Sequence, residues 1–170
     1  MSNNPCKINQ VSNRNFLSIG GFKLVIDKCR KVDFLCNKAN LPGITLGVAN
    51  QSTWLRDIPV PGDKLQYNDF TIDFIVDENL ENYHQIYEWM RALGYPETYD
   101  QLDQSRSDAT LLILNSSFQT VGKVKFRDLF PTQLTGIPFD ATITDQEYFT
   151  ATVSFKYTMF DVINDDGAEV

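Results

Sequence analysis

The chain contains one histidine, His84, so a catalytic device that relies on an imidazole must be built around that position. A serine or cysteine nucleophile needs such a base within hydrogen-bond reach. His84 falls on the polar side of a predicted helix, where a solvated surface histidine is the simpler interpretation. The residue types therefore provide no nucleophile–base pair, and we predict that the protein is not an enzyme.

Carboxylates are plentiful, but the predicted elements already explain the clustered ones. Asp73 lies near a strand end, Asp77 is a plausible helix N-cap, and Glu78 and Glu81 favour the positive end of the helix dipole. DENLE at 77–81 lacks the glycine and the Asp/Asn spacing of a calcium loop, and GxxxxGK[ST], GxGxxG and HExxH do not occur. We predict no catalytic residue, no cofactor and no metal site.

Charge and cysteine usage restrict the partners further. A net charge of −7 argues against tight nucleic-acid binding, although an acidic or neutral wall can still enclose DNA that must slide. Lys123, Lys125 and Arg127 share one strand face and could touch a phosphate or an acidic neighbour, or simply be solvated. The three cysteines, Cys6, Cys29 and Cys36, suit reduced thiols in a cytoplasm. The chain has neither a run of about 20 apolar residues nor an apolar signal segment, so we expect no membrane partner.

Hydrophobic periodicity predicts a mainly β protein with one amphipathic helix. We expect a hairpin of two strands at 22–27 and 32–36, a bend at 39–44, and a half-buried strand over 67–76. A helix follows over 80–93, with Leu80, Tyr83, Ile86, Tyr87, Trp89, Met90 and Leu93 on its apolar side. Further strands are expected at 109–114 and 123–127, a connection at 129–140, and a single strand at 148–160 that would span about 40 Å.

The length suits one domain, residues 1–170, with a polar N-terminal arm over 1–15 and an acidic tail over 164–170. The segment 45–66 has no clear periodicity, and we predict a long projecting loop. Its apolar residues Trp54, Leu55, Ile58 and Val60 would then contact another subunit, because aromatic anchors dominate interfaces. The alternative is a meandering loop folded over the chain's own core.

The order of these segments resembles one known family. FKLVI, then VDFLCNKANLPGI, then an arm ending IPVPGD, then LQYNDFTIDFIVDENLENYHQIYEWM resembles tail tube proteins of contractile-tailed, T-even-like bacteriophages. FRDLFPTQLTGIPFD followed by ATVSFKY is similar to that family's Leu-Trp-Pro segment and closing strand. The resemblance covers roughly residues 16 to 160.

The resemblance implies an antiparallel β-sandwich or barrel-like fold with one flanking helix, shared with type VI secretion tubes. It implies hexameric rings that stack into the inner tube of a contractile, myovirus-type tail, a virion structure assembled in the host cytoplasm and serving DNA ejection. Implied partners are other copies of the chain, the sheath, the tape measure protein, and the baseplate and tail terminator proteins, while DNA passes without specific binding. The strands at 70–76 and 149–159 would lie near the lumen.

Other functions remain open at this point. A type VI secretion tube protein shares the implied architecture, and a baseplate or terminator ring protein would cap a tube rather than polymerise. A ligand-binding barrel or an enzyme would be monomeric with a polar-lined pocket.

Overall fold

The computed structural model describes residues 17, 21–29, 32, 35–96, 105–139, 142 and 148–164. The predicted N-terminal arm, 1–15, lies outside the described residues, as does the predicted tail except for Asn164. The described elements are β1 (Phe22–Ile26), β2 (Cys36–Asn40), β3 (Ile44–Ser52), β4 (Asp57–Tyr67), β5 (Phe70–Ile75), α2 (Glu81–Gly94), β6 (Ser107–Leu114), β7 (Thr120–Leu134), β8 (Thr150–Lys156) and β9 (Met159–Asn164). The predicted mainly β fold with one flanking helix is confirmed.

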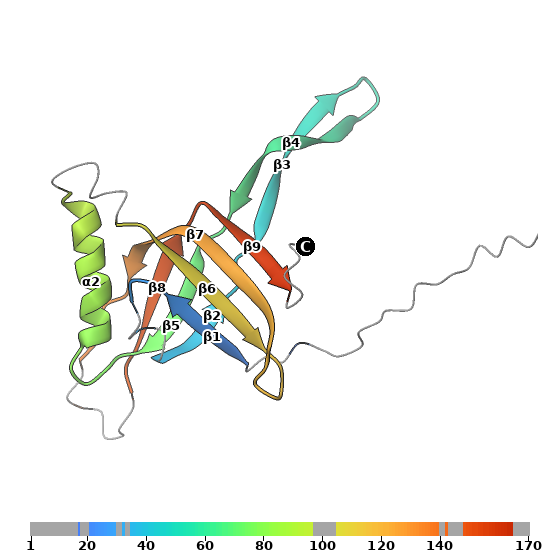
Figure 1. Ribbon diagram of the computed structural model, residues 1–170. Helices are drawn as coiled ribbons and strands as arrows, with labels where there is room; N and C mark the ends of the chain where they lie inside the picture. Colours follow the sequence, from blue (N-terminus) through green and yellow to red (C-terminus); the bar gives the residue numbers. More distant parts are fainter. Residues whose placement is uncertain are drawn as a thin grey trace, which may run out of the picture.

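The main sheet has the strand order β1-β6-β7-β8-β5-β2, with β9 also paired to β7, and every pairing is antiparallel. Strand β7 belongs to two layers. Its first half, Gly122–Arg127, pairs with β6 and β9, and its second half, Phe130–Leu134, pairs with β8. In Figure 1 the layer of β1, β6 and the start of β7 crosses in front of β5 and β8, and α2 stands at one side.

The core fills the space between these two layers. Phe70 of β5 stacks on Phe126 of β7 with ring centroids 4.4 Å apart, which joins the layers at their centre. Both rings are fully buried. The alternating pattern predicted for β5 is confirmed, since the side chains of Phe70, Ile72 and Phe74 are buried.

Helix α2 closes one side of the sandwich. The predicted apolar side is confirmed for Ile86 and Trp89, which are buried, whereas Leu80 and Tyr87 are exposed. Asp77 is not the N-cap. The helix begins one turn later, after Leu80 in a left-handed conformation (φ 58°), and no side chain caps it.

Asn82 organises this start in place of a cap. Its fully buried side chain accepts hydrogen bonds from the backbone N–H of Asp77 (3.2 Å) and of Tyr83 (2.8 Å), and donates one to the carbonyl of Ile75 (2.8 Å). The side chain therefore ties the end of β5 to the first turn of α2. Sequence reasoning missed this residue because asparagine ordinarily marks exposed turns.

The predicted hairpin of strands at 22–27 and 32–36 is wrong. Strand β1 pairs with β6. In the following segment Val32 is helical, and β2 pairs with β5. Alternation shows which face of a strand is buried, but it does not specify the partner strand.

The predicted connection at 129–140 is also partly wrong, because β7 continues through Pro131 to Leu134. Asp128 adopts a positive φ of 55°, and this irregularity carries β7 from one layer to the other. Within the described residues the second half of β7 pairs on one side only, so Pro131 removes no donor that a second strand of the same subunit would use.

The single long strand predicted over 148–160 is two strands. Strand β8 ends at Lys156 and β9 begins at Met159, and the two pair with different halves of β7. The N–H of Thr158 donates to the carbonyl of Arg127 at the break. Tyr157 fills the corner: its hydroxyl donates to the carbonyl of Asn68 (2.9 Å), and its ring meets Phe126 edge-on.

Candidate functional site

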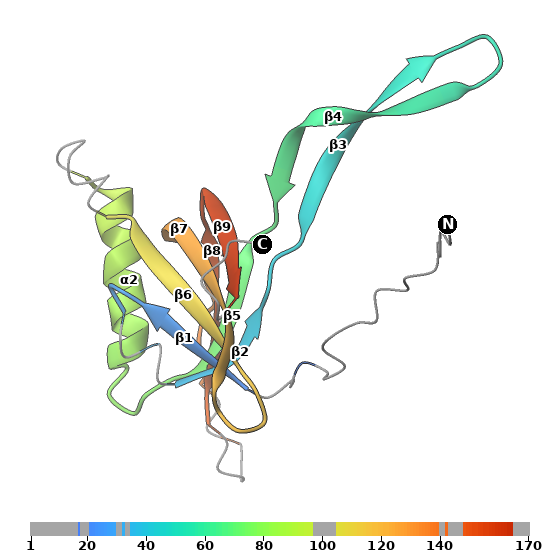
Figure 2. The same cartoon turned by 45° about the vertical axis from the view of Figure 1, so that its right-hand side comes forward.

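The segment predicted as an irregular loop is a β-hairpin that extends away from the body of the protein (Figure 2). Strands β3 and β4 pair with each other in a separate two-stranded sheet. Their register runs from Ile44 opposite Tyr67 to Ser52 opposite Asp57. The segment predicted as a long projecting loop is therefore paired, and its periodicity did not show this because exposed strands need not alternate apolar and polar residues.

The tip of this hairpin is closed by local polar contacts. The hydroxyl of Ser52 donates to the carboxylate of Asp57 (2.8 Å), and the N–H of Thr53 donates to the carbonyl of Arg56 (3.3 Å). The chain therefore turns within four residues and presents Trp54 and Leu55 at the extreme end. The side chain of Trp54 is 93% exposed and that of Leu55 is 75% exposed.

The shaft of the hairpin carries further exposed aliphatic side chains. Ile58 and Val60, the other two predicted contact residues, lie on β4, and Val60 is opposite Ala49. Sequence reasoning did not single out the exposed residues Ile44, Leu46, Val48 and Leu65. Leu46 lies directly opposite Leu65, and only this pairing shows that they form one apolar surface. Exposed apolar surfaces of this kind are typical of interaction sites, so the hairpin is the candidate site of this protein.

An irregularity midway along the hairpin depends on Gly62. The register shifts between Leu46 and Val48. Their partners in β4, Leu65 and Pro61, are separated by more residues than Leu46 and Val48 are in β3. At this shift Gly62 crosses Gly47 so closely that a Cβ on Gly62 would lie 2.7 Å from the carbonyl oxygen of Gly47. The absence of a side chain at Gly62 therefore permits the crossing visible in Figure 2.

The body of the protein adds open strand edges to this apolar arm. Within the part of the chain that the structure describes, β1 pairs only with β6 and β2 only with β5. The layer of β2, β5, β8 and the second half of β7 therefore ends on each side in a strand with one open edge. Open edges carry N–H and C=O groups that are available to another chain.

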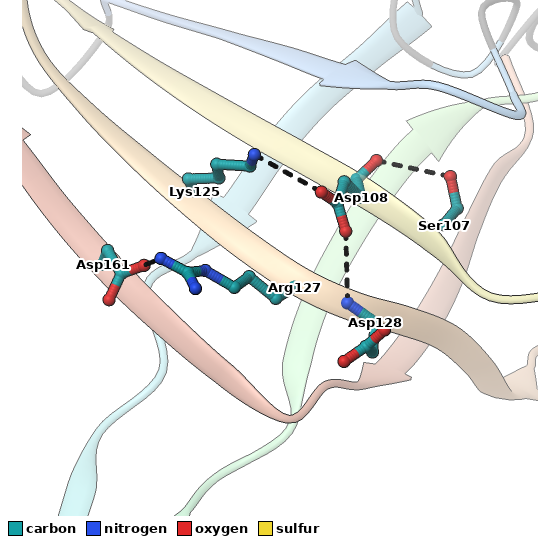
Figure 3. A network of polar contacts seen from close by, with 6 residues as sticks. All are labelled: Ser107, Asp108, Lys125, Arg127, Asp128 and Asp161. Atoms are coloured by element: carbon teal, nitrogen blue, oxygen red, sulfur yellow. Dashed lines mark hydrogen bonds and ion pairs between the residues drawn. The ribbon is translucent and has the colours of Figure 1, made fainter.

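The basic stripe on β7 is largely neutralised within its own layer (Figure 3). Lys125 Nζ lies 3.4 Å from Asp108 Oδ2, and Arg127 forms an ion pair with Asp161. The other carboxylate oxygen of Asp108 accepts a hydrogen bond from the N–H of Asp128 (3.3 Å). This network favours the interpretation of the stripe as a solvated sheet face.

The residues considered for catalysis do not converge. His84 is exposed, and its Nε2 lies 3.1 Å from Oε1 of Glu88, one helical turn away. Asp73 accepts a hydrogen bond from the hydroxyl of Thr152 (2.7 Å) and faces Lys38 (3.7 Å) on the sheet surface. Within the described ranges no three His, Cys, Asp or Glu side chains gather to hold a metal ion, and no helix has the length and apolarity to cross a membrane.

One ionisable group in the body has a strongly shifted pKa. Burial, followed by the nearby Tyr67 and Asp69, raises the pKa of Tyr157 to about 12. Each of these causes opposes formation of a phenolate. The group stabilises the corner between β8 and β9 in its neutral form and shows no arrangement for proton transfer.

Comparison with known proteins identifies the family of this chain. Residues 6–163 match the family described as phage tail tube protein. The chain belongs to this family. Among individual relatives, this tail tube family member is similar to the tail tube terminator protein of Enterobacteria phage T4, with 29% identity over 131 residues that cover 74% of each chain.

Solved structures share the fold at low sequence identity. A chain of the tube-terminating cap of the anti-feeding prophage aligns with a TM-score of 0.68 at 15% identity, covering 91% of this chain and 95% of that one. A chain of the sheath–tube complex of the PVC extracellular contractile injection system, in its extended state, aligns with a TM-score of 0.67 at 14% identity, covering 94% and 99%. The fold implied by the sequence resemblance is therefore confirmed.

Proposed function

We propose that this tail tube family member forms hexameric rings that end the inner tube of a contractile phage tail, in the role of a tail tube terminator. The observation that carries this proposal is the match over 74% of the chain to a relative named as a tube terminator. The role is structural and non-catalytic. The protein would reside in the virion after assembly in the host cytoplasm.

Ring formation is supported by the two open sides of the β2-β5-β8-β7 layer. Strand β2 of one copy and the second half of β7 of the next would pair edge to edge, and repetition of this heterologous contact closes a ring. The layers of all copies would then join into one continuous barrel around the lumen. DNA would pass through this lumen during ejection, after the tape measure protein that first occupies the tube.

Contact along the tail axis is assigned to the hairpin. Trp54, Leu55, Ile58 and Val60 would bury their exposed side chains on an adjacent subunit or ring. The sheath surrounding the tube is a further partner, and a terminator ring also contacts the last ring of tube subunits.

A second role in the body of the tube is supported by the fold comparison. The chain aligns as completely with a subunit of a sheath–tube complex as with a terminating cap, at TM-scores of 0.67 and 0.68. A tube subunit must bind copies of itself on both ring faces, whereas a terminator must bind a tube on one face only. The two roles therefore differ in whether rings of this chain stack without limit.

The oligomeric state of the purified full chain tests both roles. Sedimentation velocity over a concentration series, with negative-stain electron microscopy, should show discrete rings that cap the ends of added tail tubes. Long tubes of the pure chain would instead support the tube-body role. A compact monomer at every concentration, which also fails to bind tube ends, would overturn the proposal.

A further inference from the structure

The outward face of the β2-β5-β8-β7 layer differs chemically from its buried face. Side chains alternate along β5 and β8, so one set packs in the core and the other points away from it. The outward positions of these two strands are Thr71, Asp73, Ile75, Thr150, Thr152, Ser154 and Lys156. Cross-strand pairs such as Thr71 opposite Ser154 make this face rich in hydroxyl groups.

Each lysine on this face has a carboxylate beside it. Lys38 Nζ lies 3.7 Å from Asp73 Oδ2, and Lys156 Nζ lies 3.5 Å from Asp69 Oδ1. Asp73 is also held in place by the hydroxyl of Thr152, which donates to its other oxygen at 2.7 Å. The two lysines and the two carboxylates leave the face without net charge.

The opposite layer has a different balance. Its outward strand positions carry the basic residues Lys23, Lys123, Lys125 and Arg127. Against these four stand the paired carboxylates Asp108 and Asp161, together with Asp128 at the point where β7 leaves this layer. One basic side chain therefore remains in excess on those strands, and a ring would repeat this positive charge.

The proposed ring places the outward face of the β2-β5-β8-β7 layer around the lumen, because the other face of that layer packs in the core. We propose that Asp69 and Asp73 keep Lys156 and Lys38 from gripping the phosphate backbone of duplex DNA that passes there. The inference rests on the proposed ring function and adds which residues prevent adhesion. A lysine that contacts a phosphate releases condensed counterions. Each such contact makes the logarithm of the association constant fall more steeply with the logarithm of the salt concentration, by about 0.9 in slope. Because every subunit of a ring would carry these lysines, even weak contacts with phosphate would together slow the passage of DNA.

Neutral isosteres of the two aspartates test this role. Asp69→Asn together with Asp73→Asn keeps an acceptor oxygen for Thr152 and exposes both lysines. Preformed rings are mixed with a fluorescent linear 30-base-pair duplex, and anisotropy is measured at several salt concentrations. We expect the double variant to bind at least about tenfold more tightly than the wild type at low salt, with a steeper salt dependence.

Two control variants separate local from global charge. Glu78→Gln with Glu88→Gln makes the same change in net charge at exposed positions near or on α2, and should not gain affinity. Adding Lys38→Gln and Lys156→Gln to the aspartate variant should abolish the gain. Equal gains in the glutamate control, or a gain that survives loss of the lysines, would overturn the inference.

DNA topology tests the lumenal location. A covalently closed circular duplex cannot thread a preformed ring, so the gain should appear with the linear duplex and not with the circle. Equal gains for both would place this face outside the ring and overturn the inference. Sedimentation of each variant is the separate readout for ring formation: absence of rings in the wild type contradicts the proposed function, whereas intact rings without a gain contradict this inference alone.

Discussion

Truncating the two apolar side chains at the hairpin tip should weaken assembly strongly without destabilising the folded subunit. In Trp54→Ala with Leu55→Ala, the two lost side chains are 93% and 75% exposed, so they contribute little to the core. The free energy of unfolding of the subunit should change by no more than about 0.5 kcal/mol, as for ordinary surface substitutions. Any larger effect must come from contacts between subunits.

The cost to assembly follows from the area that Trp54 can bury. A tryptophan buries roughly 200 Å² at an interface, and at about 25 cal/mol per Å² this is worth about 5 kcal/mol before losses. Ordering of the side chain and imperfect packing reduce the cost of alanine substitution to about 2–4 kcal/mol, the range typical of interface hot spots. Such a cost weakens each contact roughly 30- to 1,000-fold.

The assay is sedimentation velocity across a concentration series, with thermal unfolding of the same samples. Trp54→Phe retains a large aromatic group and should assemble close to the wild type. Tyr95→Ala removes an exposed aromatic side chain beyond the end of α2, 83% exposed, and should leave assembly unchanged. If the double alanine variant assembles at the wild-type concentration, the hairpin tip is not an interface and the reasoning fails.

Two further predictions concern the folded subunit. Asn82→Ala should lower the free energy of unfolding by about 2–3 kcal/mol, because it removes a fully buried side chain and leaves two partly buried backbone groups without its hydrogen bonds. Urea denaturation measures this change, with Asn37→Ala at an exposed position as the control. Equal midpoints for the two variants would contradict the prediction. Tyr157 should ionise at about 12, after ordinary tyrosines near 10, in an absorbance titration. Because its folded-state pKa is raised, its contribution to stability is present below about pH 10 and is lost as pH rises through about 12. The stability gap between the wild type and Tyr157→Phe should therefore narrow over that range, and a gap independent of pH would refute the assignment.

The parts predicted well from sequence are those in which the pattern of apolar residues matches the pattern of burial. Phe70, Ile72 and Phe74 alternate because one face of β5 meets the core, and α2 shows a helical period because Ile86 and Trp89 meet the same core. The apolar tip at Trp54 was also visible, since a tryptophan among polar neighbours is conspicuous even where no strand is predicted. Its role as a contact residue remains a prediction.

The sequence alone determined the class of the fold, the burial pattern of the clearly alternating strands, the amphipathic helix and the family resemblance. Each of these depends on residues that are close together along the chain. Pairing was decided only in three dimensions. That β3 and β4 form a hairpin, that β7 turns from one layer to the other at Asp128, and that β8 and β9 part at Tyr157 all depend on partners distant in sequence. The neutralisation of Lys38 and Lys156 is likewise a tertiary property, since the charge of a face depends on which strands the fold sets side by side.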